Sequence, residues 1–265
     1  MSEDQNQVEE RKKKLIGFFK GKQAIYYLGL ILVLAFSIFI RTRNISKLKD
    51  VTTGTWTLGP DLDPFLFLRW AEYIVAHGQL MIVDVMRNVP LGFNTSSEMK
   101  LLSYLMAWFH NFLSAIGLSN SITYSAILFP VFGFTLTAIA FFLFSRKIFD
   151  DENKITKNII ALVATLILVL IPSLLPRSIA GIPEKESIAY AFMFLTFYFF
   201  ICSYNEKKVM KAYMFAIFAG ASTALGSLLW GGISLVYMIM AGAVLFAFLL
   251  GKMDKTKMYS FGLWI

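Results

Sequence analysis

One short charged segment, 176–187, lies between two long apolar runs and contains the residues best suited to chemistry. It holds four charged side chains, Arg177, Glu184, Lys185 and Glu186. Because one ionised side chain at a bilayer centre costs roughly 2.5–3.5 kcal/mol, the segment is predicted to be a short loop at the water boundary. Two acids one residue apart, with an arginine before them, could hold a metal ion beside an anionic group.

A second acidic segment begins at Asp61 and opens a predicted amphipathic helix that runs to His77, with Pro64 suited to the first helical position. Asp63 could simply cap this helix, a frequent role of aspartate. It could instead join Glu184 and Glu186 as a carboxylate ligand of a hard ion such as Mg²⁺ or Mn²⁺.

The charged loop also has a simpler explanation. Glutamates at a helix start gain roughly 0.3–1 kcal/mol from the helix dipole, so Glu184 and Glu186 could serve only to begin the next helix. Arg177 could be an ordinary interface anchor. His77 and His110 are isolated and are interpreted as structural. The single cysteine, Cys202, excludes an intramolecular disulfide and a cysteine metal site.

The elements that must position these residues are membrane helices. Hydrophobic residues make up 57% of the 265-residue chain, above the roughly 45–50% of soluble domains. The net charge of +8 comes from bases clustered beside apolar runs. This pattern is typical of cytoplasmic loops and not of nucleic-acid binding. We therefore predict an all-α polytopic membrane protein, with membrane lipid as a partner and no nucleic acid.

The apolar runs divide the chain. Residues 1–23 are predicted to form a basic cytoplasmic tail, and 24–265 a transmembrane domain with a large first outer loop at 41–121. The predicted spans are 24–40, 122–144, 159–175, 188–204, 212–229 and 233–250. The apolar run at 261–265 looks like the opening of another span, so we expect the sequence to be truncated.

Positive charge sets the orientation of these spans. The loops at 145–157, 205–211 and 251–257 are all rich in lysine and should lie inside with the N-terminus. That arrangement requires 101–117 not to cross, so this run is predicted to be an outer-face or re-entrant helix. The first outer loop, the 176–187 segment and Trp230-Gly231-Gly232 then share the outer face.

In combination, three motifs resemble the catalytic subunit of oligosaccharyltransferase, the STT3/AglB/PglB family of GT-C membrane glycosyltransferases. DPFLFLRWAEYIVAHG is similar to the acidic motif of the family's first loop. RSIAGIPEKESIA is similar to its second motif, which ends in an acid-x-acid pair, and Trp230-Gly231-Gly232 to its Trp-Gly-Gly turn. Two departures are the Glu-Lys-Glu form of the pair, where the family often has an aspartate, and Tyr104-Leu105-Met106-Ala107, where it has Tyr-Pro-Gly-Leu.

The resemblance implies the N-terminal part of a GT-C transmembrane helix bundle, without the family's later helices and soluble domain. It implies that Asp63 and Glu184 ligate Mn²⁺ or Mg²⁺, that Glu186 ligates or supports the ion, and that all three are catalytic. Asp63 would also face the acceptor amide, and Arg177 would bind the lipid pyrophosphate.

The implied reaction moves an oligosaccharide from a polyprenyl or dolichyl (pyro)phosphate carrier to the asparagine of Asn-x-Ser/Thr. The partners would be this lipid-linked oligosaccharide and an acceptor polypeptide. The location would be an archaeal cell membrane with the active site outside, and the chain alone is expected to be inactive.

Two alternatives stay open. Another GT-C transferase with a polyprenyl-phosphate sugar donor would share the acidic first loop but not the Trp-Gly-Gly register. A cation-coupled secondary transporter would place its acids near the membrane midplane, whereas here they lie at the ends of apolar runs. Two sequons, Asn44-Ile45-Ser46 and Asn94-Thr95-Ser96, also lie in the first outer loop and make self-modification possible.

Overall fold

The computed structural model describes residues 23–265, so the expected tail at 1–23 lies almost entirely outside the described residues. The long helices are α2 (Gln23–Thr42), α5 (Ile122–Ile148), α6 (Lys154–Leu170), α7 (Glu186–Asn205), α8 (Val209–Ser227) and α9 (Ser234–Leu249). The shorter elements are η1 (Ile45–Lys47), α3 (Asp63–His77), β1 (Val83–Asp84), β2 (Phe93–Asn94), η2 (Thr95–Ser97), α4 (Leu101–Ala115), η3 (Gly231–Ile233) and α10 (Lys255–Trp264).

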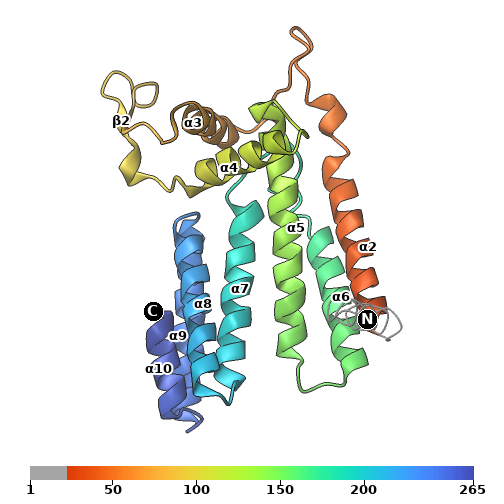
Figure 1. The fold of residues 1–265 in the computed structure, drawn as a ribbon, viewed down its shortest axis with the longest axis vertical. Coiled ribbons are helices and arrows are strands. Elements are labelled where there is room, and N and C mark those ends of the chain that lie inside the picture. Colours follow the sequence, from red (N-terminus) through yellow and green to blue (C-terminus); the bar gives the residue numbers. More distant parts are fainter. Residues whose placement is uncertain (1–22) are drawn as a thin grey trace, which may run out of the picture.

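The molecule has two layers, which Figure 1 shows from the side. The long helices run side by side, and α3 and α4 lie across one end of this bundle. Within residues 23–265, five helical segments are long and apolar enough to cross a membrane: Ala24–Lys47, Ile122–Ile148, Glu186–Asn205, Val209–Ser227 and Gly231–Leu249. The predicted all-α membrane bundle is thus confirmed.

The direction of the chain places the lysine-rich loops together. Successive long helices alternate in direction, so the α5–α6, α7–α8 and α9–α10 turns lie at the end opposite α3 and α4 (Figure 1). At that end the Tyr204 hydroxyl donates to the Lys252 carbonyl at 3.1 Å, joining two of the turns. Helix α4 has 15 residues and lies across the bundle, as the charge pattern predicts.

The expected span at 159–175 is displaced in the structure. Helix α6 begins at Lys154 and ends at Leu170, five residues earlier than predicted at both ends. Its 17 residues extend about 25 Å, slightly short of a bilayer core. The apolar residues 171–175 form turns instead of helix, because they lead into the loop that carries the second acidic motif.

Local signals fix where the helices begin. The Ser121 hydroxyl accepts from the Tyr124 amide at 3.2 Å at the start of α5. The Asn153 side chain accepts from the amides of Ile155 and Thr156 at the start of α6. Asp254 does the same for Lys257 at the start of α10. Each cap satisfies amides that have no partner within the helix.

The largest buried cluster lies where the two layers meet. It joins Phe67 and Trp70 of α3 and Leu102 and Met106 of α4 to the first turns of α5 and α7. Ala180 of the second motif and Leu229, next to the Trp-Gly-Gly turn, belong to the same cluster. Burial of this apolar surface therefore brings the three sequence motifs to one end of the bundle.

A single buried arginine ties the second motif to the bundle. Arg41, at the end of α2, is fully buried and stacks over the Phe134 ring at 3.6 Å. Its guanidinium donates to the Ser37 hydroxyl, the Ser178 hydroxyl and the Val169 carbonyl. The Arg41 carbonyl in turn accepts from the Ala180 amide at 2.9 Å. One residue thus connects α2, α6 and the 176–187 segment.

We predict that Arg41→Ala destabilises the protein by roughly 2–4 kcal/mol, because it leaves buried acceptors without their charged donor. Thermal unfolding in detergent measures the effect. Arg43→Ala is the matched control, since Arg43 is exposed two residues away and should change stability little. Equal losses in both variants would contradict a special role for Arg41.

Candidate functional site

Asp63 is the first residue of α3, and the helix cap is Leu62, which makes no side-chain capping bond. The structure therefore does not use Asp63 as the helix cap. The Asp63 side chain is exposed, and the next residue, the buried Pro64, starts the helix with a backbone angle already suited to it. The carboxylate is thus presented at a rigid helix start.

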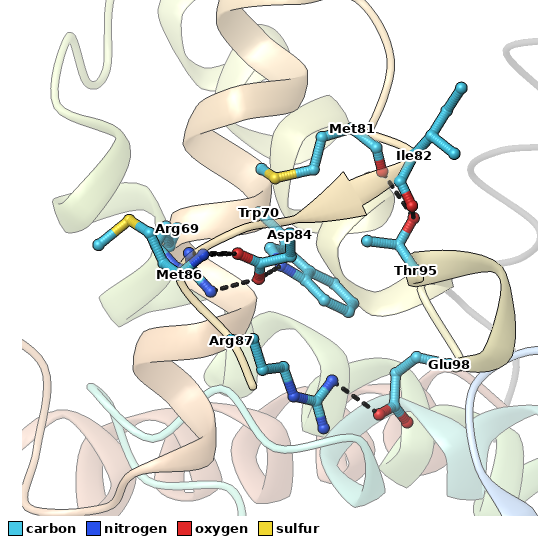
Figure 2. Close-up of polar contacts among 9 residues, drawn as sticks. All are labelled: Arg69, Trp70, Met81, Ile82, Asp84, Met86, Arg87, Thr95 and Glu98. Carbon is cyan, nitrogen blue, oxygen red and sulfur yellow. Dashed lines mark hydrogen bonds and ion pairs between the residues drawn. The ribbon is translucent and has the colours of Figure 1, made fainter. Parts of the chain in front are cut away.

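A buried aspartate anchors the middle of α3. Figure 2 shows Asp84, at the end of β1, enclosed between Arg69 and Trp70 of α3. Both terminal nitrogens of Arg69 donate to the Asp84 carboxylate, and the Trp70 indole donates at 2.9 Å. Burial alone would raise the pKa of Asp84, but these bonds and the Met86 amide lower it. Asp84 therefore stays ionised and fixes the rotation of α3.

A chain of charges continues from this hairpin to the second motif. Arg87 lies against the Phe93 ring at 4.0 Å. It also pairs with Glu98 at 3.1 Å (Figure 2). Glu98 also faces Lys185 at 3.6 Å. The Lys185 ammonium lies 5.1 Å from the centre of the Phe67 ring on α3. The lysine between the two glutamates thus connects the first outer loop to the second motif.

Backbone contacts hold the 176–187 loop against its neighbours. The Gly181 amide donates to the Ile127 carbonyl of α5 at 3.0 Å, and the Gly181 carbonyl accepts from the Gly59 amide at 2.8 Å. Gly181 has φ +86°, and a Cβ atom there would lie 2.5 Å from a Leu48 methyl carbon. Only glycine fits this position, which brings the loop beside the segment that leads to Asp63.

Glu184 and Arg177 form a pair of unequal exposure. Glu184 is buried, whereas the Arg177 side chain is 51% exposed. An Arg177 nitrogen lies 3.2 Å from Oε1 of Glu184, so the two form an ion pair. An anion that approaches from outside therefore meets the guanidinium before the carboxylate.

Burial and nearby acidic side chains raise the pKa of Glu184. Burial, then the negative charge of Glu186 and smaller effects of Asp61 and Asp63, raise the pKa of Glu184 to about 7, although Arg177 lowers it. Asp63 of the first loop and Glu186 of α7 are thus near enough to Glu184 to act on its charge. The three predicted site residues lie in one electrostatic environment.

The donor set fits a divalent cation in part. Oε2 of Glu186 is buried and accepts no hydrogen bond from residues 23–265, whereas Oε1 of Glu184, also buried, faces only the guanidinium of Arg177. A buried carboxylate oxygen without a donor, such as that of Glu186, favours a cation. However, no three Asp, Glu, His or Cys side chains of that range are grouped closely enough to enclose an ion. The metal-ligand roles of Asp63, Glu184 and Glu186 stay a prediction.

The Trp-Gly-Gly turn borders the same end of the bundle. The Trp230 ring lies directly over Gly232, where a Cβ atom would come within 2.2 Å of the ring. The ring also packs edge-on against Tyr190 of α7 at 5.2 Å. Gly231 approaches a Met99 methyl carbon of the first outer loop. Gly232 therefore allows the Trp230 ring to fold over the turn.

Comparison with known proteins identifies the family of the chain. A family model, "Oligosaccharyl transferase STT3, N-terminal", matches residues 30–264. The chain belongs to the STT3 family. No curated protein sequence matches the chain.

Solved structures of an archaeal oligosaccharyltransferase share the fold. AglB from Archaeoglobus fulgidus with an inhibitory peptide and a dolichol-phosphate superposes with a TM-score of 0.74 at 20% identity, over 92% of this chain and 28% of that one. The A. fulgidus enzyme in complex with Zn and sulfate gives 0.73 at 21% identity, over 89% and 30%. The same enzyme tethered to an acceptor peptide with the NVT sequon gives 0.74 at 19% identity, over 94% and 30%. The chain thus spans under a third of the length of these structures.

Several residues that support the site in this STT3 chain are not evident as functional from the sequence. Arg41 looks like the end of a span, although a charge at the end of a long apolar run is a usable signal. Asp84 follows a short apolar run in a similar way. The role of Glu98 has no sequence signal, because its partner Lys185 lies far away along the chain.

The remaining candidate residues have clear structural surroundings. The His77 ring stacks on Tyr73, and the buried His110 contacts the Ser125 hydroxyl at 2.9 Å. Cys202 is buried and free. Of the two sequons, the Asn44 amide donates to the Ala180 carbonyl at 2.7 Å and is partly buried, whereas Asn94 is exposed.

The raised pKa of Glu184 predicts a pH dependence of stability in the absence of divalent cations. The folded chain keeps a proton that the unfolded chain has released, so stability should fall as the pH rises from about 4.5 to about 7 and level off above. Thermal unfolding with a chelator present measures this slope.

Glu184→Gln should flatten that slope, and Glu152→Gln, in a turn at the opposite end, should leave it unchanged. A slope that persists in Glu184→Gln would assign the titration to another group.

Proposed function

We propose that this chain carries part of the active site of an oligosaccharyltransferase. Such an enzyme transfers an oligosaccharide from a lipid (pyro)phosphate carrier to the asparagine of Asn-x-Ser/Thr. The observation that carries the proposal is the convergence of Asp63 and the Arg177–Glu184–Glu186 loop over one buried cluster in an STT3 domain. The related structures support it, because one contains a dolichol-phosphate and another an acceptor peptide with the NVT sequon.

The residues of this chain suggest a division of tasks. Arg177 is half exposed beside a buried carboxylate, which suits it to bind and neutralise a phosphate group of the lipid carrier. When the new bond from the acceptor nitrogen to the sugar carbon forms, the bond to the carrier oxygen breaks and the carrier leaves with negative charge. Arg177 would stabilise that charge.

Asp63, Glu184 and Glu186 would hold a divalent cation, Mn²⁺ or Mg²⁺, that acts as a Lewis acid and template for the two substrates. The Zn and sulfate in one related structure support a divalent cation and an anion in this family. The exposed carboxylate of Asp63 would orient the acceptor amide, and the buried Glu184 would anchor the site. We place this site on the outer face of the membrane, because the lysine-rich loops lie at the other end.

A transfer assay tests the proposal. Membranes that express the reading frame to its stop codon should move glycan from a lipid-linked donor to a fluorescent Asn-x-Thr peptide. Asp63→Ala and Glu184→Ala should each lower the rate at least about 100-fold, as expected for the loss of a ligand or its support. Glu152→Ala is the control and should keep full activity.

The outcomes separate two claims. No transfer by a well-expressed wild-type frame with several donors would favour another GT-C transferase. Transfer that survives both substitutions would show that the site residues are wrongly assigned even though the family is right.

A second experiment measures cation binding to the 265-residue chain. Mn²⁺ at a hundred times its dissociation constant should stabilise the folded chain by about 2.7 kcal/mol. A thermal shift series with Mn²⁺, Mg²⁺ and Zn²⁺ measures this, and Glu184→Ala should lose the shift while Glu152→Ala keeps it. An identical shift in all three proteins would place the cation elsewhere.

A further inference from the structure

A second cluster of charged residues lies at the lysine-rich end of the bundle, far from the proposed active site. Arg146 and Lys147 come from the last turn of α5, and Lys157 from the first turn of α6. With Asp150 of the connecting turn, they line a cavity of about 170 Å³. Leu143 of α5 and Tyr198 of α7 complete its wall. Three helices therefore build this cavity.

The cluster carries more positive charge than its acid can balance. Asp150 accepts from Lys147 at 2.6 Å and from Lys157 at 2.7 Å, and these bonds lower the pKa of Asp150 to about 2. One carboxylate thus forms ion pairs with two lysines. The side chain of Arg146 donates to the Tyr27 hydroxyl at 3.2 Å, a neutral partner. The cavity lining has a surplus of two positive charges.

Other acids nearby do not remove this surplus. Asp151 and Glu152 follow in the same turn but are not part of the cavity wall. Glu206 acts on Lys147 electrostatically, yet it lies at the exposed end of α7 and also interacts with Lys208 and Lys211.

The placement of Lys157 is unfavourable for the helix that carries it. Cations near a helix N-terminus oppose the helix dipole, and α6 has no acid in its first turn. Lys147 and Arg146 suit the C-terminal turn of α5, so the dipole explains them. It does not explain Lys157, whose side chain instead reaches Asp150 in the cavity wall.

The position of the cavity at the end of the membrane helices favours a lipid head group as the anion that it binds. Its wall includes α5 and α7, two of the helices that are long and apolar enough to cross a membrane, and the apolar Leu143 lies in the same wall as the bases. The cavity is therefore at the level where the apolar bundle meets water. Basic pockets between membrane helices on the cytoplasmic side suit lipid head groups.

We propose that this cavity binds the phosphate of an anionic phospholipid from the leaflet at the lysine-rich end. Arg146, Lys147 and Lys157 contact the phosphate. The bound lipid supplies the charge that Asp150 alone does not, and it bridges α5, α6 and α7. This site is separate from the proposed transferase site at the opposite end.

The test uses the 265-residue chain reconstituted in vesicles of equal parts phosphatidylcholine and phosphatidylglycerol. After extraction into mild detergent, native mass spectrometry counts the lipids that remain bound. Wild type should retain phosphatidylglycerol in preference to phosphatidylcholine. Lys157→Gln and Arg146→Gln should each reduce that preference about fivefold, the size expected for one base near a lipid phosphate. Lys157→Arg should restore it.

Lys211→Gln is the matched control, because Lys211 is exposed in the first turn of α8 at the same end of the bundle. An equal loss in Lys211→Gln would reduce the effect to diffuse surface charge and overturn the site. No preference for phosphatidylglycerol in wild type would overturn it as well. Displacement of the lipid by millimolar inorganic phosphate would identify a free-phosphate site and overturn the lipid assignment. Equal melting temperatures of Arg146→Gln and wild type exclude misfolding as the cause.

Discussion

The buried guanidinium of Arg41 is the interaction on which the arrangement of the site depends. A charge within an apolar bundle is stable only when its donors are satisfied, and Arg41 reaches partners on its own helix, on α6 and in the second motif. The same residue accepts the Ala180 amide through its carbonyl. The loop that carries Arg177 and Glu184 therefore cannot move independently of the membrane helices. The buried guanidinium of Arg41 thereby fixes the position of the loop that carries Arg177 and Glu184.

The layer across the end of the bundle positions the other half of the site. Asp63 lies on α3, and the rotation of α3 is fixed because Asp84 binds both Arg69 and Trp70. The Glu98–Lys185 pair then joins this layer to the start of α7. The two acidic segments are thus connected by charge as well as by the shared apolar cluster. This arrangement brings carboxylates of like charge together, and the pKa of Glu184 is raised by its burial and then by the charge of Glu186.

The two ends of the bundle carry clusters of opposite charge. At one end carboxylates gather around Glu184, and at the other, bases gather around Asp150. The carboxylates around Glu184 repel one another, whereas Asp150 attracts the two lysines that pair with it. The first cluster therefore carries like-charge repulsion, and the second keeps an excess of positive charge. That polarity agrees with the distribution of lysines from which the orientation in the membrane was predicted.

The sequence by itself determined most of the helices and the identity of the motifs, and it predicts an orientation in the membrane. Apolar runs bounded by lysines specify spans and sidedness, because burial in lipid and retention of positive charge act locally along the chain. The sequence misplaced α6 by five residues, since 171–175 is apolar whether it continues a helix or enters a loop. It also could not reveal that Asp63 leaves capping to the backbone, that Lys185 faces Glu98, or that Lys157 shares Asp150 with Lys147. Those facts depend on which helices pack together, and only the tertiary structure decides that, because the partners lie on separate elements whose contacts no local pattern encodes.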